Sequence, residues 1–182
     1  MDYLKKVIGF VAGFVVVYAT IYLISGRGDL LKKFEPYHAE DGRFTASFPG
    51  EPTKKTQLLY TPDEQLDFVT YEAGPAGSGF VVGYCDYSQE VMDKYEPKQM
   101  LDVSVIGAVK NVQGELTEEK ELDFHGHQGK EIRIMAPDDL IIRARFILVK
   151  NRLYQIMAAS SSVKVVEKKG TEFFESFRVD GL

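Results

Sequence analysis

The pentapeptide HGHQG at residues 125–129 is the stretch whose residue types most readily suggest chemistry. It places His125 and His127 one residue apart, and two imidazoles can ligate a metal ion or exchange protons. A zinc site needs three or four protein ligands, yet no cysteine or carboxylate stands at ligand spacing from these histidines. Gly126 and Gly129 can supply the backbone angles of a tight hairpin loop. We predict a solvated hairpin tip, and we keep His125 and His127 as candidate metal ligands.

The remaining reactive residues give weaker patterns. Cys85 is the only cysteine, and as a nucleophile it would need His125 or His127 as a base. A lone cysteine within a strand is usually a small buried apolar residue. Asp138 and Asp139 could contact calcium, but calcium takes six or more oxygens, and the turn after a proline explains this pair. Without a Walker, HExxH, CxxC or nucleophile-elbow motif, the sequence names no reaction, and we expect no cofactor.

Composition and charge limit the function classes. The chain has 182 residues, 45% of them hydrophobic, which suffices for one domain with a proper core. The formal net charge is −5 and the isoelectric point is about 5.3. Phosphate binding needs a basic surface, so we expect no nucleic-acid partner. Residues 1–28 are nevertheless basic, which suits a membrane anchor followed by an acidic soluble domain.

Residues 7–24 read VIGFVAGFVVVYATIYLI, without charge or proline. As a helix they would span roughly 27 Å, close to the hydrocarbon thickness of a bilayer. A cleaved signal peptide is the alternative, but its apolar region is shorter and ends in small residues. We therefore predict a transmembrane helix that contacts the lipid bilayer and is retained as a signal-anchor. Gly9 and Gly13 form a G-x-x-x-G pattern through which two such helices could pair as a homodimer.

The predicted organisation has three parts: an anchor at 1–25, a tether at 26–42 and a domain at 43–182. Lysines precede the predicted span and basic residues also follow it, so the positive-inside rule is nearly balanced. The short leading segment is typical of a signal-anchor with its amino terminus in the cytoplasm. We expect a single-pass protein of the cell membrane, with the carboxy-terminal domain on the extracytoplasmic, periplasmic side.

The domain is predicted to be α+β. In residues 43–49, Phe44, Ala46 and Phe48 alternate with polar residues, the period of a half-buried strand. The glycine-rich segment 74–79 precedes another strand and no helix, so we interpret it as a hairpin loop. Further strands are predicted at 55–60, 67–73, 80–87, 114–124, 129–136, 140–149 and 152–160.

Two amphipathic helices complete the predicted domain. Residues 97–112 begin with a proline suited to a first helical turn, and Leu101, Val105 and Ala108 share one apolar stripe. Residues 163–177 carry a stripe that includes Phe173 and Phe174. We expect both helices to flank an antiparallel sheet, with their stripes in its core.

The register of one hairpin follows from its charge pattern. Pairing Ala136 with Leu140 puts the apolar residues of 129–136 and 140–149 on one face and the charged ones on the other. The charged face then carries Glu131 opposite Arg145, and Arg133 opposite Arg143. One interpretation is a solvated face with ordinary ion pairs. The other makes Arg133, Arg143 and Arg145 a binding site for an anion or an acidic partner.

Several segments together resemble bacterial domains similar to PsbP, the extrinsic subunit of photosystem II. FTASFPGEP (44–52) resembles their opening strand, and ELDFHGHQGKEI (121–132) resembles one of their hairpins. RLYQIMAAS (152–160) and EFFESFRV (172–179) resemble their last long strand and closing helix. The resemblance covers about residues 43–180 and implies the Mog1/PsbP-like fold, an antiparallel sheet between helices. It implies no catalytic residue, since the family is not known as one of enzymes.

Two functional hypotheses remain open. The first is a membrane-anchored, extracytoplasmic interaction or accessory module that contacts another envelope protein and has no catalytic activity. The second is a small-ligand or metal-binding domain centred on His125 and His127, with hydrolytic activity as a further option.

Overall fold

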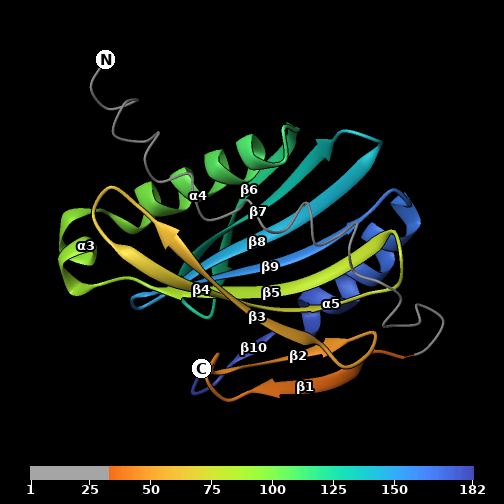
Figure 1. Ribbon diagram of the computed structural model, residues 1–182, viewed down its shortest axis with the longest axis horizontal. Helices are drawn as coiled ribbons and strands as arrows, with labels where there is room; N and C mark the ends of the chain where they lie inside the picture. The colour runs from red at the N-terminus through yellow and green to blue at the C-terminus, as the bar shows by residue number, and fades with distance from the viewer. Residues whose placement is uncertain (1–32) are drawn as a thin grey trace.

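Residues 33–182, which the computed structural model describes, form two antiparallel sheets with helices against them (Figure 1). The main sheet has seven strands and the small sheet has three. In spatial order the main sheet contains β3 (Thr53–Tyr60), β4 (Gln65–Ala73), β5 (Ser78–Asp86), β9 (Arg152–Ser160), β8 (Leu140–Val149), β7 (His127–Ala136) and β6 (Glu115–Phe124). The small sheet contains β1 (Glu35–Ala39), β2 (Phe44–Phe48) and β10 (Arg178–Val179), with β2 in the centre.

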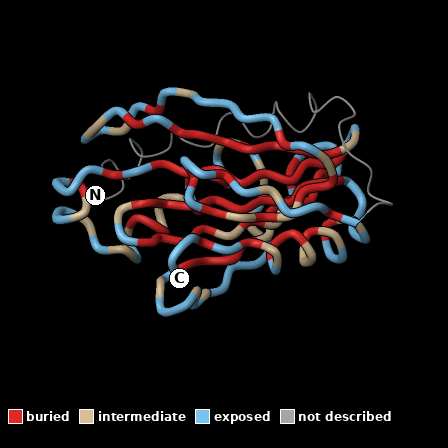
Figure 2. The backbone as a smooth tube through the Cα atoms, turned by 90° about the horizontal axis from the view of Figure 1, so that it is seen from below, coloured by how far each residue is buried: buried red, intermediate tan, exposed pale blue. Residues whose placement is uncertain are grey.

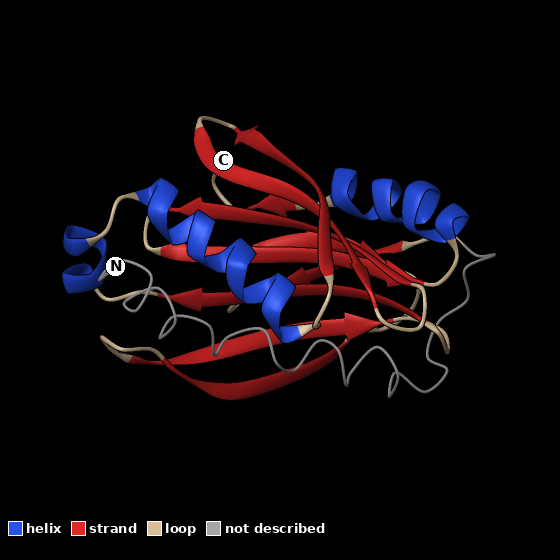
Figure 3. Ribbon diagram, turned by 90° about the horizontal axis from the view of Figure 1, so that it is seen from above, coloured by secondary structure: helices blue, strands red, loops and turns tan. Residues whose placement is uncertain are grey.

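Each face of the main sheet is covered by different elements (Figures 1 and 3). On one face, α4 (Pro97–Asn111) packs on β7 and β8, and the short α3 (Gln89–Lys94) precedes it. On the other face lie the small sheet, a π-helical turn η2 (Val165–Lys169) and α5 (Gly170–Ser176). The central strands are therefore buried on both sides, as Figure 2 shows, and all nine residues of β9 are buried.

The apolar patterns of the sequence explain these elements. Leu101, Val105 and Ala108 face the core beneath α4, and the predicted helix at 97–112 is confirmed. Phe44, Ala46 and Phe48 are fully buried, as the alternation in residues 43–49 predicts. The predicted α+β class and the antiparallel main sheet are likewise confirmed.

The predicted hairpin register is also confirmed. Ala136 pairs with Leu140, Arg133 with Arg143, and Glu131 with Arg145. Three residues connect β7 and β8: Pro137 accepts a hydrogen bond from the Leu140 N–H at 3.3 Å, and between them Asp138 and Asp139 both have positive φ, at 59° and 56°. A turn of this kind matches the twist of the flanking strands and so fixes their register.

The amino-terminal boundary of the fold differs from the prediction. The tether expected at 26–42 overlaps the fold, because β1 pairs with β2 along its whole length and Phe34 is buried in the core. The helical segment that begins at residue 163 contains the π-helical η2 at Val165–Lys169, and its α-helical part ends at Ser176. The predicted membrane span at 7–24, including Gly9 and Gly13, lies outside the described residues. Within residues 33–182, no helix combines the length and apolarity needed to cross a membrane.

Phe173 joins the layers on the α5 side of the main sheet. Its ring lies edge-on against Phe48 of the small sheet, at 5.2 Å, and against Phe80 of the main sheet, at 5.5 Å. Such contacts add to the energy gained by burying the rings. Phe173 is therefore a central attachment point of α5.

We expect Phe173→Ala to lower the free energy of unfolding by about 3–5 kcal/mol, because it leaves a cavity where three layers meet. Chemical denaturation measures this loss. Met135→Ala, at a side chain that is 40% exposed, serves as the control and should change stability by less than about 0.5 kcal/mol. Equal losses in the two variants would contradict this role of Phe173.

Candidate functional site

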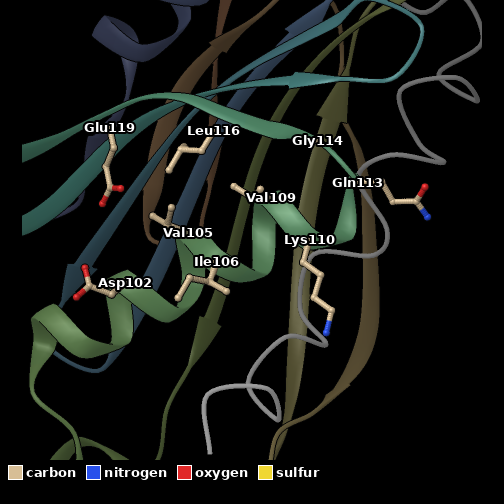
Figure 4. A pocket seen from close by; sticks show the side chains of 9 residues that line it. All are labelled: Asp102, Val105, Ile106, Val109, Lys110, Gln113, Gly114, Leu116 and Glu119. Atoms are coloured by element: carbon tan, nitrogen blue, oxygen red, sulfur yellow. The ribbon is translucent and has the colours of Figure 1, made fainter. Parts of the chain in front are cut away.

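A groove of about 740 Å³ lies between α4 and the edge strand β6 (Figure 4). The residues that line it are Asp102, Val105, Ile106, Val109, Lys110, Gln113, Gly114, Leu116 and Glu119. Most of them come from one flank of α4, where positions three and four residues apart are neighbours. Gly114 makes the return from α4 to β6 tight, since a Cβ atom there would lie 2.4 Å from Cγ2 of Ile134.

The floor of the groove is apolar and partly open to solvent. Because α4 packs on β7 and β8, the outermost strand β6 projects past it, and Leu116 stays only partly covered. Ile106 is 47% exposed and Val109 is half-buried. Exposed apolar side chains gathered in a hollow characterise contact sites more than single exposed residues do.

Carboxylates gather at one end of this groove around a buried lysine. The Lys130 side chain is only 5% exposed, and its Nζ forms ion pairs with Asp102 and Glu119. A third carboxylate, that of Glu121, lies 3.8 Å away. Burial would lower the pKa of Lys130, but the hydrogen bonds to Asp102 and Glu119 outweigh burial and raise it above its usual 10.5. Lys130 is therefore a fixed positive charge beneath the carboxylates.

The three arginines predicted as a binding site share one face of the main sheet, beneath η2 and α5. Arg143 donates to Glu131 at 2.7 Å, and Arg145 donates to the same carboxylate at 2.6 Å. Arg133 pairs with Glu167 of η2, and Arg143 also donates to Glu167 at 3.3 Å. The arginines thus have counterions within the chain and tie the last helical segment to the sheet. A role for them in binding an anion stays a prediction.

Glu131 is the centre of this arginine cluster. Burial would raise the pKa of Glu131, but hydrogen bonds from Arg143 and Arg145 outweigh it and lower the pKa below its usual value of 4.5. The unfolded chain therefore takes up the proton at higher pH than the folded chain does. Acidification below about 4.5 removes the stabilisation that the ionised carboxylate gives to the fold.

We expect Glu131→Gln to lower the free energy of unfolding at pH 7 by about 2 kcal/mol, because two charged hydrogen bonds are weakened. The difference from the unmodified chain should shrink as the pH falls below 4.5, which denaturation at several pH values measures. Glu167→Gln, at a side chain that is 46% exposed, is the control and should cost less than about 1 kcal/mol. A pH-independent difference would contradict this account.

The histidines of HGHQG lie at a hairpin tip. His125 and Gly126 have φ angles of 54° and 83° and make the turn between β6 and β7. The Gly126 N–H donates to Asp123 Oδ1 at 3.1 Å, and His127 begins β7 opposite Phe124. Gly129 does not shape the turn, contrary to expectation. It lies within β7, where a Cβ atom would come 2.7 Å from the carbonyl oxygen of Phe146.

The described part of the chain contains no group of three histidine, cysteine or carboxylate side chains placed to hold a metal ion. We expect dialysis against EDTA to leave the melting temperature unchanged, since a metal bound only to the folded state would stabilise it. Differential scanning calorimetry before and after dialysis measures this. Stoichiometric zinc that disappears in His125→Ala/His127→Ala would instead establish the metal-binding hypothesis.

Cys85 lies in β5 with its side chain in the α4-side core. Burial raises the pKa of its thiol to about 12. A thiol with so high a pKa holds almost no thiolate at neutral pH, and the thiolate is the nucleophilic form. This supports the interpretation of Cys85 as a buried apolar residue.

A polar cluster that sequence reasoning missed is centred on Asp41. The Asp41 carboxylate accepts hydrogen bonds from Tyr71, from Tyr84 at 2.7 Å and from Lys54 at 2.6 Å. Burial would raise the pKa of Asp41, but these hydrogen bonds keep it well below its usual range. Arg152 adds a hydrogen bond to the Asp41 carbonyl oxygen at 2.9 Å. The cluster fastens the β1–β2 loop to the main sheet.

The arrangement of these elements is a PsbP-like α+β fold, which confirms the resemblance seen in the sequence. Cyanobacterial PsbP (CyanoP) from a Synechocystis species matches with a TM-score of 0.56 at 13% identity. The match covers 85% of this chain and 98% of that one. A Pseudomonas aeruginosa protein of unknown function matches with a TM-score of 0.40 at 13% identity, over 77% of this chain and 91% of that chain. No family model and no curated protein sequence matches the chain. At this identity, the likeness to PsbP establishes the fold and not an activity.

Proposed function

We propose that the protein is a non-catalytic accessory module that binds another protein of the cell envelope through the α4–β6 groove. The observation that carries this proposal is the open apolar floor of the groove at Ile106, Val109 and Leu116. Exposed apolar hollows with polar margins are typical of protein contact sites.

The polar clusters elsewhere support a structural role for their members. Asp41 and Glu131 are each held by two or more donors from within the chain. Groups committed to such contacts fasten the layers of the fold together and are poorly placed to act on a substrate. This distribution favours a binding surface over a reactive centre.

We further propose that residues 7–24 hold the module on the extracytoplasmic side of the membrane. The uncharged apolar run and the basic residues before it support this location. The described fold begins beside Phe34, which is buried on the α5 side of the main sheet. The groove is lined by α4, on the opposite side of the main sheet from Phe34, so a chain attached through its amino terminus can keep the groove accessible.

A photo-crosslinking amino acid at position 106, in the full chain in its native membrane, tests this proposal. We expect one discrete adduct with another envelope protein, identified by mass spectrometry, because Ile106 lies on the proposed contact surface. The matched control is position 135, where Met135 is similarly exposed but lies on the α5 side of the sheet. The same adduct from both positions, or none from position 106, would contradict the proposal.

A further inference from the structure

The two ends of the α4–β6 groove differ in charge. Figure 4 shows Asp102 and Glu119 at one end, while Lys110 and Gln113 lie at the other. Glu121, which is 69% exposed, follows Glu119 on the same face of β6. The groove therefore has an acidic end and an end without carboxylates among its lining residues.

The acidic end carries more negative charge than its lysines neutralise. Lys130 contacts all three carboxylates, and Lys98 lies 3.6 Å from Asp102 and 3.3 Å from Glu121. Two positively charged ammonium groups thus pair with three negatively charged carboxylates, which leaves one negative charge in excess. The three carboxylates are also partly exposed to solvent. An added cation is attracted to such a site, and an added anion is repelled.

The strand β6 is acidic on both faces. Its sequence, ELTEEKELDF, contains five carboxylates and a single lysine, and of these carboxylates Glu119 and Glu121 lie on the groove side while Glu118 lies on the other. Charged side chains along an edge strand also oppose the pairing of a further strand, which disfavours an extended occupant. The groove itself follows the helix α4, whose lining flank from Asp102 to Lys110 is roughly 12 Å long, about two helical turns.

We propose that the occupant is an amphipathic helix of the partner protein, with an apolar stripe and with lysine or arginine at one end. Its apolar side chains cover Ile106, Val109 and Leu116, since a helix can pack alongside α4 with side chains between those of α4. Its basic residues meet Glu119 and Glu121 and thereby fix its direction along the groove. This inference rests on the proposed docking function and specifies the chemistry of the partner.

A peptide selection tests the inference. The full chain is held in nanodiscs of zwitterionic phosphatidylcholine, and a phage-displayed library of random 16-residue peptides is selected on it. As a helix such a peptide is roughly 24 Å long, enough to cover the groove-lining flank of α4 and extend beyond it. Peptides that bind empty nanodiscs are removed first, so that lipid binders do not survive. We expect the enriched peptides to carry apolar residues three and four apart, with lysine or arginine at one end.

Variants of the acidic end then separate charge from apolar contact. For an enriched peptide, Glu119→Gln/Glu121→Gln should weaken the Kd about fivefold to tenfold, and this effect should diminish in high salt. Ile106→Asp should weaken binding more than tenfold, because it places a charge on the apolar floor. The control is Glu118→Gln, on the opposite face of β6 beside Arg133, and it should change the Kd less than twofold. Unchanged melting temperatures show that the variants fold.

Acidic peptides, alternating apolar patterns or an equal effect of Glu118→Gln would overturn the inference about the partner. The inference about the partner is also overturned if no peptide is enriched while position 106 still gives its adduct. In that case the docking function is supported, but the partner is not a basic amphipathic helix. If no peptide is enriched and position 106 also gives no adduct, both proposals are overturned, because the groove then accepts no partner.

Discussion

The burial of the central strands on both faces is the constraint on which the rest of the structure depends. All of β9 and nearly all of β5 are buried, so each face of the main sheet needs its own cover. The α4 side is covered by one long helix, and the other side by α5 together with a second sheet. Because α4 packs on β7 and β8, the outer strand β6 lies beyond its cover. The sheet is thus wider than the helix that covers it, and the groove lies where β6 extends past α4.

Three clusters of charged side chains lie where these layers meet. Glu131 holds arginines beneath α5, Lys130 connects α4 with β6, and Asp41 holds the small sheet against the main one. A charge that is partly buried needs partners with good geometry, and partners from different layers also fix how the layers sit. The same contacts explain why residue types that suggest chemistry in the sequence serve mainly as connections in the fold.

Local patterns were sufficient to predict the main sheet, because alternation of apolar and polar residues fixes both a strand and its register. The β7–β8 pairing from Ala136 and Leu140 onward is an example. The strand β1 was missed since its sequence, EPYHA, is polar and contains a proline. Glu167 was missed as a partner of Arg133 because a helix brings it there from a distant part of the chain. The groove could not be predicted from the sequence either. It depends on the position of α4 across the sheet, and no sequence motif encodes that position.

The burial of Cys85 has a practical consequence for work on this molecule. A thiol enclosed in the core and held in its protonated form reacts slowly with maleimides and with mild oxidants. Spin labels or fluorophores can therefore be placed on single cysteines introduced at the surface without first replacing the native one. In an oxidising compartment, the same enclosure protects the chain from mixed disulfides and keeps its monomers from becoming covalently linked.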